Sequence, residues 1–251
     1  MIKIENFRCP HCKFPMELSE NQKSIICRGA KRHCFDLSSS GYVNLAPPSQ
    51  SGSGDSKEAI RSRTSFLESG AYAPVCQAIS EAVNKYCTGG LVVDAGCGEG
   101  YYTNKIARAY AGDVAGFDLS KHGVEYASKF AKREGIPNSF FAVSSVYTLP
   151  VDDGTVEGIV NIFAPCVEEE YKRALKKGGV LIVAGAGENH LLGLKEAIYE
   201  TTYKNTERED MPSGMELVEE KTVAFDLELN DKNLILALFS MTPYYYRTSE
   251  E

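Results

Sequence analysis

The sequence predicts an α/β fold, in which a doubly wound, mostly parallel, Rossmann-like sheet follows a small cysteine-rich module. Three observations predict it. Short apolar runs alternate with helical segments from residue 90 to residue 203. A glycine-rich turn follows the first of these runs, and four cysteines crowd into residues 9–34. Strand–helix alternation at this spacing is typical of a parallel sheet covered on both faces.

The helices and strands follow one another in a regular order. A capping box, Asp55 with Glu58, begins the first helix, and Gly70 ends it. A strand and a helix are expected in the looser tail, at 221–229 and 232–241. The expected helices lie at 57–69, 74–86, 101–110, 121–134, 168–175 and 190–203, and the expected strands of the sheet at 90–96, 113–120, 139–145, 156–165 and 178–187.

The charge of the chain is unevenly distributed. The 251 residues carry 27 Lys and Arg against 34 Asp and Glu, a net charge of −7, which argues against nonspecific nucleic-acid binding over the whole surface. Residues 1–37 are the exception, with seven basic and four acidic side chains. No apolar run is long enough to span a membrane, and the opening "MIKIENFRC" is not a signal peptide. We therefore expect a cytoplasmic protein without a membrane partner.

The cysteine-rich stretch has the spacing of a zinc site. Cys9 and Cys12 form a CxxC pair, Cys27 follows, and His33 or Cys34 completes four ligands. Zinc prefers thiolate and imidazole ligands in a tetrahedron, and a metal can replace the core that so short a module lacks. The alternatives are disulfides or a redox CxxC, but thiols stay reduced in the cytosol and no thioredoxin pattern surrounds this pair. We expect a zinc module over 1–37, a Ser/Gly/Pro-rich linker over 38–56 and one large domain over 57–251.

The turn in "VVDAGCGEGYY" points to a nucleoside cofactor. Gly96, Gly98 and Gly100 allow the backbone to approach a ligand closely at the start of a helix. A dinucleotide is disfavoured, because the carboxylates of Asp94 and Glu99 would repel a pyrophosphate but attract the ammonium of a methionine group. The remaining alternative is a turn with only a structural role.

The ends of the next two strands support the same cofactor. Asp118 ends the second strand, where an acid can accept the ribose hydroxyls of an adenosine. Ser144 and Ser145 follow the third strand, where an adenine would lie. The inferred ligand is S-adenosylmethionine.

Further motifs extend over nearly the whole chain, from Cys9 to about Arg247. They are "FDLSSSGYVNLAPP", "FLESGAYAPV", "VVDAGCGEGYYT", "NIFAPC", "GENHLLGLK" and "MTPYYYR". Together with the zinc knuckle they resemble the 23S ribosomal RNA (guanine-N1)-methyltransferases, which modify a hairpin near the peptide exit tunnel and whose relatives confer resistance to macrolides such as tylosin. The resemblance implies S-adenosylmethionine-dependent methylation of guanine N1 in a 23S rRNA hairpin.

The resemblance also implies roles for particular residues. The zinc ligands would be Cys9, Cys12, Cys27 and His33, although a longer gap before the histidine than the family has leaves Cys34 open as the fourth ligand. The cofactor contacts would be Tyr72, Gly98, Glu99 and His190. Tyr72 can also simply fill the groove between the first two helices, and His190 can simply cap a helix. The family pattern further implies a closing antiparallel strand that this chain is expected to lack.

The acceptor side of the reaction is less defined by the sequence. Asn161 and Phe163 lie at the carboxyl end of the fourth strand, where substrate meets cofactor in this topology, and Phe163 either stacks on the guanine or packs under the sheet edge. No residue is identified as the acceptor of the N1 proton. Arg61 and Arg63 would either touch RNA phosphates or form a solvated helix face.

Two other functions are consistent with the sequence. A small-molecule methyltransferase could use the zinc module as a structural element, and a non-catalytic relative could bind RNA without turnover. For the main interpretation, we expect Lys31 and Arg32 of the basic module to contact RNA. The sequence leaves a homodimer open.

Overall fold

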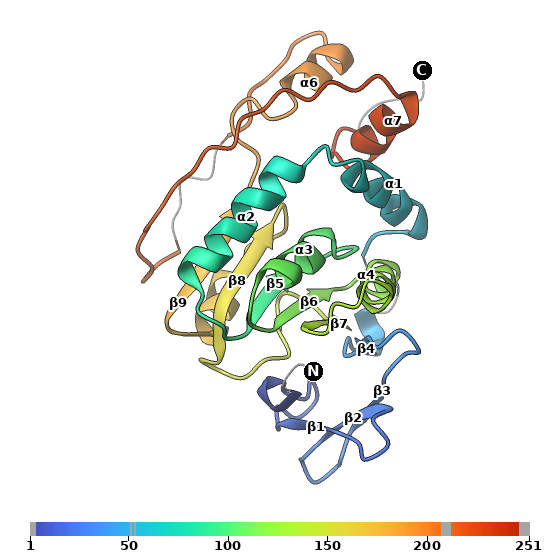
Figure 1. The fold of residues 1–251 in the computed structure, drawn as a ribbon, viewed down its shortest axis with the longest axis vertical. Coiled ribbons are helices and arrows are strands. Elements are labelled where there is room, and N and C mark those ends of the chain that lie inside the picture. The colour runs from blue at the N-terminus through green and yellow to red at the C-terminus, as the bar shows by residue number, and fades with distance from the viewer. Residues whose placement is uncertain (1–3, 51, 53, 207–211, 246–251) are drawn as a thin grey trace.

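The computed structural model describes residues 4–50, 52, 54–206 and 212–245, and its centre is a six-stranded sheet (Figure 1). The strand order is β4-β7-β6-β5-β8-β9, and every neighbouring pair is parallel. This is the expected doubly wound sheet, whose strand order reverses beside β5. The strands are β4 (Val43–Asn44), β5 (Val92–Ala95), β6 (Val114–Asp118), β7 (Ser139–Val143), β8 (Val156–Ile162) and β9 (Leu175–Ala184).

One face of the sheet is covered by three helices, α2 (Ala73–Tyr86), α3 (Tyr101–Ala109) and α4 (Lys121–Arg133). Their apolar side chains, among them Val83, Ile106 and Val124, share a buried core with the strands. The remaining helices are α1 (Lys57–Glu68), α5 (Glu168–Ala174), α6 (Leu192–Ile198) and α7 (Lys232–Ser240), with short 3₁₀ turns at Ile4–Asn6 and Pro48–Gln50. Among the described helices, none combines the length and the apolar character needed to span a bilayer.

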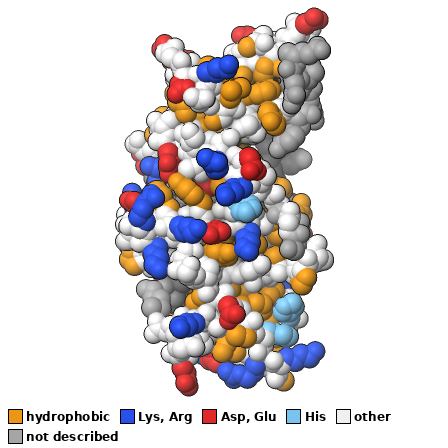
Figure 2. All heavy atoms as spheres, turned by 90° about the vertical axis from the view of Figure 1, so that its right-hand side faces the viewer, with side chains coloured by type: hydrophobic (Ala, Val, Ile, Leu, Met, Phe, Trp, Pro, Cys, Tyr) orange, Lys and Arg blue, Asp and Glu red, His pale blue; other side chains and the backbone are white. Residues whose placement is uncertain are grey.

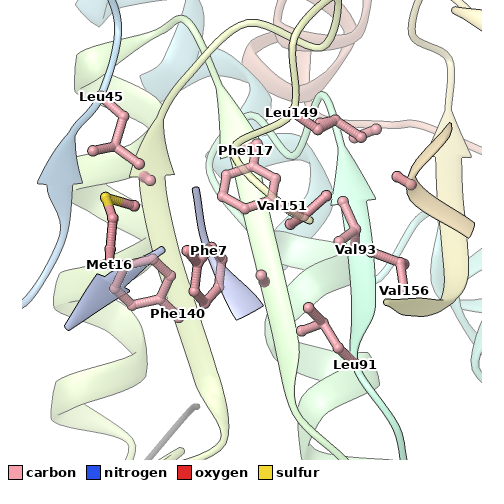
Figure 3. Close-up of a cluster of buried hydrophobic side chains, with 14 of the residues drawn as sticks. Phe7, Met16, Leu45, Leu91, Val93, Phe117, Phe140, Leu149, Val151 and Val156 are labelled. Atoms are coloured by element: carbon pink, nitrogen blue, oxygen red, sulfur yellow. The ribbon is translucent and has the colours of Figure 1, made fainter. Parts of the chain in front are cut away.

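On the opposite face, the N-terminal module packs against the strands together with α5 and the connection between β7 and β8. The module is a three-stranded antiparallel sheet of β1 (Met16–Leu18), β2 (Ser24–Cys27) and β3 (Cys34–Asp36). The ring of Phe7 lies 6.0 Å from that of Phe117 and 5.2 Å from that of Phe140, and Met16 is buried in the same cluster (Figure 3).

This packing explains how that face of the sheet is covered although no helix lies between β7 and β8. Residues 144–155 form no helix, so the connection leaves apolar strand surface to be covered. The amide of Arg8 donates to the carbonyl of Pro150 at 2.9 Å, and the Arg8 guanidinium pairs with Asp152. The zinc module therefore takes the place of a crossover helix, and the two parts share one core.

The segment expected to be a linker is built into the edge of the sheet. Val43 pairs with Ala142 in the parallel ladder, and the amide of Leu45 donates to Val143 O at 2.9 Å. The carbonyls of Ser39 and Ser40 accept hydrogen bonds from α4. The domain boundaries stay predictions, but residues 38–45 do not form a free tether.

Three local predictions were wrong. Ser56, not Asp55, caps α1, because its hydroxyl accepts from the amide of Ala59 while Asp55 pairs with Arg63. The helix expected over 190–203 is the shorter α6, because Leu191 adopts a left-handed conformation just before it. The expected strand at 221–229 is absent.

The tail follows helix α2 instead of pairing with β9. Glu219 accepts from Lys85 and Tyr86 at 3.2 and 2.9 Å, and Lys221 pairs with Glu81 at 3.2 Å. These side-chain contacts hold the tail without a backbone ladder. Within the described residues, β9 is an outer strand of the sheet with no antiparallel neighbour. The lack of a closing strand stays a prediction.

Candidate functional site

The glycine turn after β5 forms the centre of the candidate site. Gly96, Gly98 and Gly100 have φ angles of 90°, 54° and 75°, in the left-handed region that side chains disfavour. Gly100 also begins α3, and a Cβ there would lie 2.5 Å from the Cβ of Ala127. The turn thus depends on glycine both for its conformation and for the approach of α4.

Two carboxylates expected to bind the cofactor lie beside this turn. Asp94 is 1% exposed, and its Oδ2 accepts from the Thr103 hydroxyl at 2.5 Å. Asp118 accepts from the amide of Gly98 at 2.9 Å and from the amide of Ser120 at 2.7 Å. The second bond fixes the end of β6 against α4, and the first ties it to the glycine turn.

Glu99 is the most unusual acid of the site. It is 4% exposed, and its Oε2 makes no hydrogen bond within the part of the chain that the structure describes. The nearest cation is Arg63, whose Nη1 lies 3.8 Å away and whose Nη2 pairs with Asp55 at 2.6 Å. Burying a carboxylate oxygen without a hydrogen bond destabilises the fold unless a ligand donates one to it.

Arg63 was not predicted to belong to this site. Its guanidinium pairs with Asp55 and Glu99 while 29% of the side chain stays exposed, so Arg63 borders the glycine turn, and its contact with RNA phosphates stays a prediction. Coulombic attraction to Glu99 and Asp55 raises the pKa of Arg63 despite its burial. The Asp55–Arg63 spacing is a sequence signal for this placement, since an acidic residue just before a helix can pair with an arginine two turns into the helix. Arg61, by contrast, is exposed.

Burial raises the pKa of the acids around the turn. The pKa of Asp94 is raised to about 7 by burial, although the Thr103 hydrogen bond opposes the shift. Burial likewise raises the pKa of Glu99 to about 7, against the attraction of Arg63. The pKa of Asp118 is raised by burial too, and the hydrogen bonds from Ser120 and Gly98 limit the shift. The turn is an environment in which an added cation would be stabilised.

The two serines expected near an adenine lie beside Asp118. Ser144 and Ser145 are each 4% exposed, directly after β7. The amide of Ser144 donates to the carbonyl of Asp118 at 3.0 Å. The structure therefore brings the predicted residues of three neighbouring strands to one edge of the sheet.

An aromatic group flanks the other side of the turn. The Tyr72 hydroxyl and His190 Nε2 lie 2.9 Å apart, although 118 positions separate them in the chain. The ring of Phe163 stacks on that of His190 with centroids 5.6 Å apart, and Phe163 is 47% exposed. Phe163 has a φ of 51°, which is strained for a bulky residue and is frequent at functional sites.

The protonation of this pair follows from its surroundings. Burial raises the pKa of Tyr72 to about 12, so the hydroxyl keeps its proton and donates. Burial and the charge of Lys195 lower the pKa of His190, so the ring is neutral and accepts at Nε2. Tyr72 also packs against Phe66 of α1, which accounts for its burial without excluding ligand contact.

Asn161 is buried near the carboxyl end of β8. It is 1% exposed, and its amide donates to Pro165 O at 3.0 Å and to the Tyr171 hydroxyl at 2.9 Å. These bonds hold the loop that carries Phe163. Because buried partners use its amide nitrogen, Asn161 has only its side-chain oxygen left for a ligand, and its contact with substrate stays a prediction. Phe163 is the exposed residue of the motif.

The N-terminal module brings together a cluster of metal-ligand type. The ligand atoms of Cys9, Cys12, Cys27 and His33 lie within 4.8 Å of one another. His33 Nδ1 is 3.5 Å from each of the three sulfurs, and the Cys12 and Cys27 sulfurs are 3.7 Å apart. A tetrahedral zinc with Zn–S of about 2.3 Å and Zn–N of about 2.0–2.1 Å holds its ligands about 3.5–3.8 Å apart. Cys34 is exposed and lies outside this cluster.

The parallel sheet, the acidic glycine turn and the Cys₃His cluster define a Rossmann-like S-adenosylmethionine-dependent methyltransferase with a zinc ribbon. Two family models match these parts separately. The model described as "Methyltransferase domain" matches residues 92–179, and the model described as "RlmA, N-terminal" matches residues 7–53.

Three relatives match most of the chain. The YxjB protein of Bacillus subtilis (strain 168), classed by its name among the 23S rRNA (guanine-N(1)-)-methyltransferases, is 35% identical over 82% of this chain and 74% of its own. The 23S rRNA (guanine(748)-N(1))-methyltransferase of Streptomyces fradiae is 31% identical over 78% and 68%. A protein of Micromonospora griseorubida with a name of the same kind is 31% identical over 78% and 70%. The chain belongs to the 23S rRNA (guanine-N1)-methyltransferase family.

Proposed function

We propose that this protein transfers a methyl group from S-adenosylmethionine to N1 of a guanine in a hairpin of 23S rRNA. The observation that carries the proposal is the 35% identity to a relative of that class over 82% of the chain. The arrangement of the site supports it, because charged and aromatic groups suited to a sulfonium cofactor and a base meet at the carboxyl ends of five strands. The expected location is the cytoplasm, where ribosomes are found.

The cofactor is proposed to lie across the carboxyl ends of β5, β6 and β7. Its methionine ammonium would be held by Glu99, whose Oε2 has no other hydrogen-bond donor among the described residues. Its carboxylate would meet the guanidinium of Arg63, and its ribose hydroxyls would meet Asp118. Ser144 and Ser145 would border the adenine, while Asp94 and the three glycines shape the turn.

The guanine is proposed to enter beside Phe163 and His190. Methyl transfer is an in-line displacement, so the main task of the protein is to hold the acceptor nitrogen against the methyl group. A guanine inside a stem hides N1, and the base must therefore come from a loop or be extruded. The exposed ring of Phe163 offers a stacking surface for it. Tyr72 and His190 form the wall between the two ligands.

The zinc module is proposed to read the hairpin. Cys9, Cys12, Cys27 and His33 would bind the metal, which holds the module in shape. Next to this cluster lies a hollow of about 480 Å³, bordered by His11, Phe14 and Lys31 among others. Phe14 is 53% exposed and gives a base a surface to stack on, while Lys31 is exposed at the rim.

A primer-extension assay tests this function. The full chain is incubated with S-adenosylmethionine and unmodified 23S rRNA, and reverse transcriptase is run across the exit-tunnel hairpins. A methyl group on guanine N1 blocks pairing, so we expect a new stop one nucleotide before one guanine, dependent on both protein and cofactor. Asp118→Ala should weaken the stop by lowering cofactor affinity.

One outcome of this assay would contradict the proposed acceptor. If the wild-type chain binds S-adenosylmethionine in a calorimeter yet produces no stop in any hairpin, the proposed acceptor is wrong. A screen of small-molecule acceptors would then be the next experiment.

A further inference from the structure

The outward side of α4 carries several basic side chains on a molecule whose net charge is −7. Lys121, Lys129, Lys132 and Arg133 are all exposed there. Figure 2 shows Lys and Arg side chains over the middle of this face of the molecule, where α1 and α4 lie, with acidic side chains and a histidine among them and further histidines at the lower end. Lys57 and Arg61 are exposed on α1, which packs against α4.

The opposite charge dominates the C-terminal region. Residues 186–231 contain twelve Asp and Glu but only four Lys and Arg. A polyanion approaching this protein is therefore repelled by one part of the molecule and attracted by the α4 face.

Helix α4 physically connects the two parts that an RNA hairpin must reach. Its first turn lies against the cofactor turn, since a Cβ on Gly123 would be 2.6 Å from the carbonyl oxygen of Gly98. Its later turns touch the exit of the zinc module, where Ser128 Oγ donates to Ser40 O at 2.7 Å and Lys132 Nζ to Ser39 O at 2.9 Å. Helix α4 therefore spans the distance between the cofactor turn and the exit of the zinc module.

Some cations of the surface have acidic neighbours without a close ion pair. Within the described part of the chain, Glu58 interacts electrostatically with Lys57 and Arg61, and Glu125 does so with Lys121. Lys129 pairs with Glu125 at 2.5 Å, and Arg133 with Glu134 at 3.1 Å, both at exposed positions where such pairs are weak. The surface also offers little for reading bases, because Arg108 and Arg133 cover the ring of Phe130.

We infer that the outer face of α4, with Lys57 and Arg61 of α1, binds the phosphate backbone of the RNA stem that joins the hairpin loop read by the zinc module to the methyl-transfer site. This inference rests on the proposed function and adds a surface to it. The contacts are with phosphates, so they position the RNA and carry no sequence preference. Their signature is a dependence of affinity on salt, because each neutralised phosphate releases counterions.

The test compares two triple variants that remove the same charge from different faces. One is Arg61→Ala/Lys121→Ala/Lys129→Ala on the proposed surface. The matched control is Lys85→Ala/Lys177→Ala/Lys204→Ala, three exposed lysines outside it. The probe is a fluorescein-labelled 23S rRNA hairpin, titrated by anisotropy at several KCl concentrations, with S-adenosylmethionine affinity measured by calorimetry.

We expect the surface variant to bind the hairpin about tenfold more weakly at low salt and to lower the slope of log K against log salt by about 2. The control variant should keep the wild-type affinity and slope, and both should keep the wild-type cofactor affinity. Equal losses in the two variants, or no loss in either, would overturn the inference. Wild-type binding without methylation would refute only the proposed function, whereas no wild-type binding would refute both.

Discussion

Buried carboxylates at the two ends of the central sheet differ in the hydrogen bonds that they accept. At the amino end, Glu157 of β8 is 4% exposed and accepts hydrogen bonds from the amides of Thr88, Gly89 and Gly90, at 3.1, 3.1 and 2.6 Å. Tyr110 and Lys176 donate to it at 2.8 and 2.7 Å. At the carboxyl end, Glu99 is equally buried, but one of its oxygens makes no hydrogen bond with the described residues.

The difference has opposite consequences for acid–base behaviour. Burial alone would raise the pKa of Glu157, but the hydrogen bonds from Lys176, Tyr110 and the backbone bring it far below its ordinary value. Its contribution to stability is therefore present above about pH 4.3 and is lost as the pH falls below that value. The pKa of Glu99 is raised to about 7 by burial, so its contribution is present below about pH 4.3 and is lost as the pH rises toward 7.

We interpret this contrast as a division of roles between the ends of one sheet. Enough donors surround the acid at the amino end to make its charge stabilising. At the carboxyl end, Glu99 Oε2 lacks a hydrogen-bond donor among the described residues, and a cationic ligand would supply one. Perturbed carboxylates are frequent at functional sites for this reason.

The largest expected effect comes from removing the satisfied carboxylate. Glu157→Ala leaves three amides and the Lys176 ammonium without their acceptor, and should lower the free energy of unfolding by about 3–5 kcal/mol. Urea denaturation measures it. Glu169→Ala, at an exposed position of α5, is the control and should change stability by less than about 0.5 kcal/mol. A loss below about 1 kcal/mol for Glu157→Ala would contradict the claim that the charge of Glu157 stabilises the fold.

The corresponding change at the carboxyl end should affect binding and not folding. Glu99→Gln removes a buried negative charge, and should weaken S-adenosylmethionine binding by about tenfold or more, since a hydrogen bond to a charged group contributes about 1.5–3 kcal/mol. At pH 8, where the native acid is ionised, unfolding stability should be unchanged or higher. Calorimetric titration and urea denaturation of the same preparation measure both quantities. If Glu99→Gln kept the wild-type affinity for S-adenosylmethionine but unfolded more easily, Glu99 would serve folding and not cofactor binding.

A pair of tyrosine substitutions gives the smallest expected effects. Tyr110→Phe removes one of several donors to Glu157 and should lower unfolding stability by about 1–2 kcal/mol with no change in cofactor affinity. Tyr72→Phe removes the hydrogen bond to His190 and should lower cofactor affinity a few-fold, with stability within about 0.5 kcal/mol of the wild type. Equal stability losses for the two variants would argue against a division of roles between the two ends of the sheet.

Much of this architecture could be predicted from the sequence. The strands β5 to β9 and the helices between them follow from local periodicity, and the glycine turn with Asp94 and Asp118 follows from spacing along the chain. Spacing also supplied the four candidate zinc ligands, though the choice between His33 and Cys34 needed the fold of the module.

Other features depend on contacts between distant residues and leave no local pattern. The packing of Phe7 on Phe117 and Phe140 makes the module part of the core, yet nothing near residue 7 indicates it. Arg63 lies on a helix whose buried side is known only once α1 is placed against the cofactor turn. The family resemblance implied Tyr72 and His190 separately as cofactor contacts. The hydrogen bond between them was not predicted, because their elements meet only in the folded chain.

The most direct test of this account is the affinity of the wild-type protein for S-adenosylmethionine between pH 6 and pH 8. Because Asp94 and Glu99 titrate at about 7 in the free protein and a cation favours their ionised forms, affinity should rise by at least about tenfold over this range. Glu99→Gln should show a clearly smaller rise. A wild-type affinity that does not change with pH, or that changes as much in the variant, would contradict the role assigned to the acids at the carboxyl end.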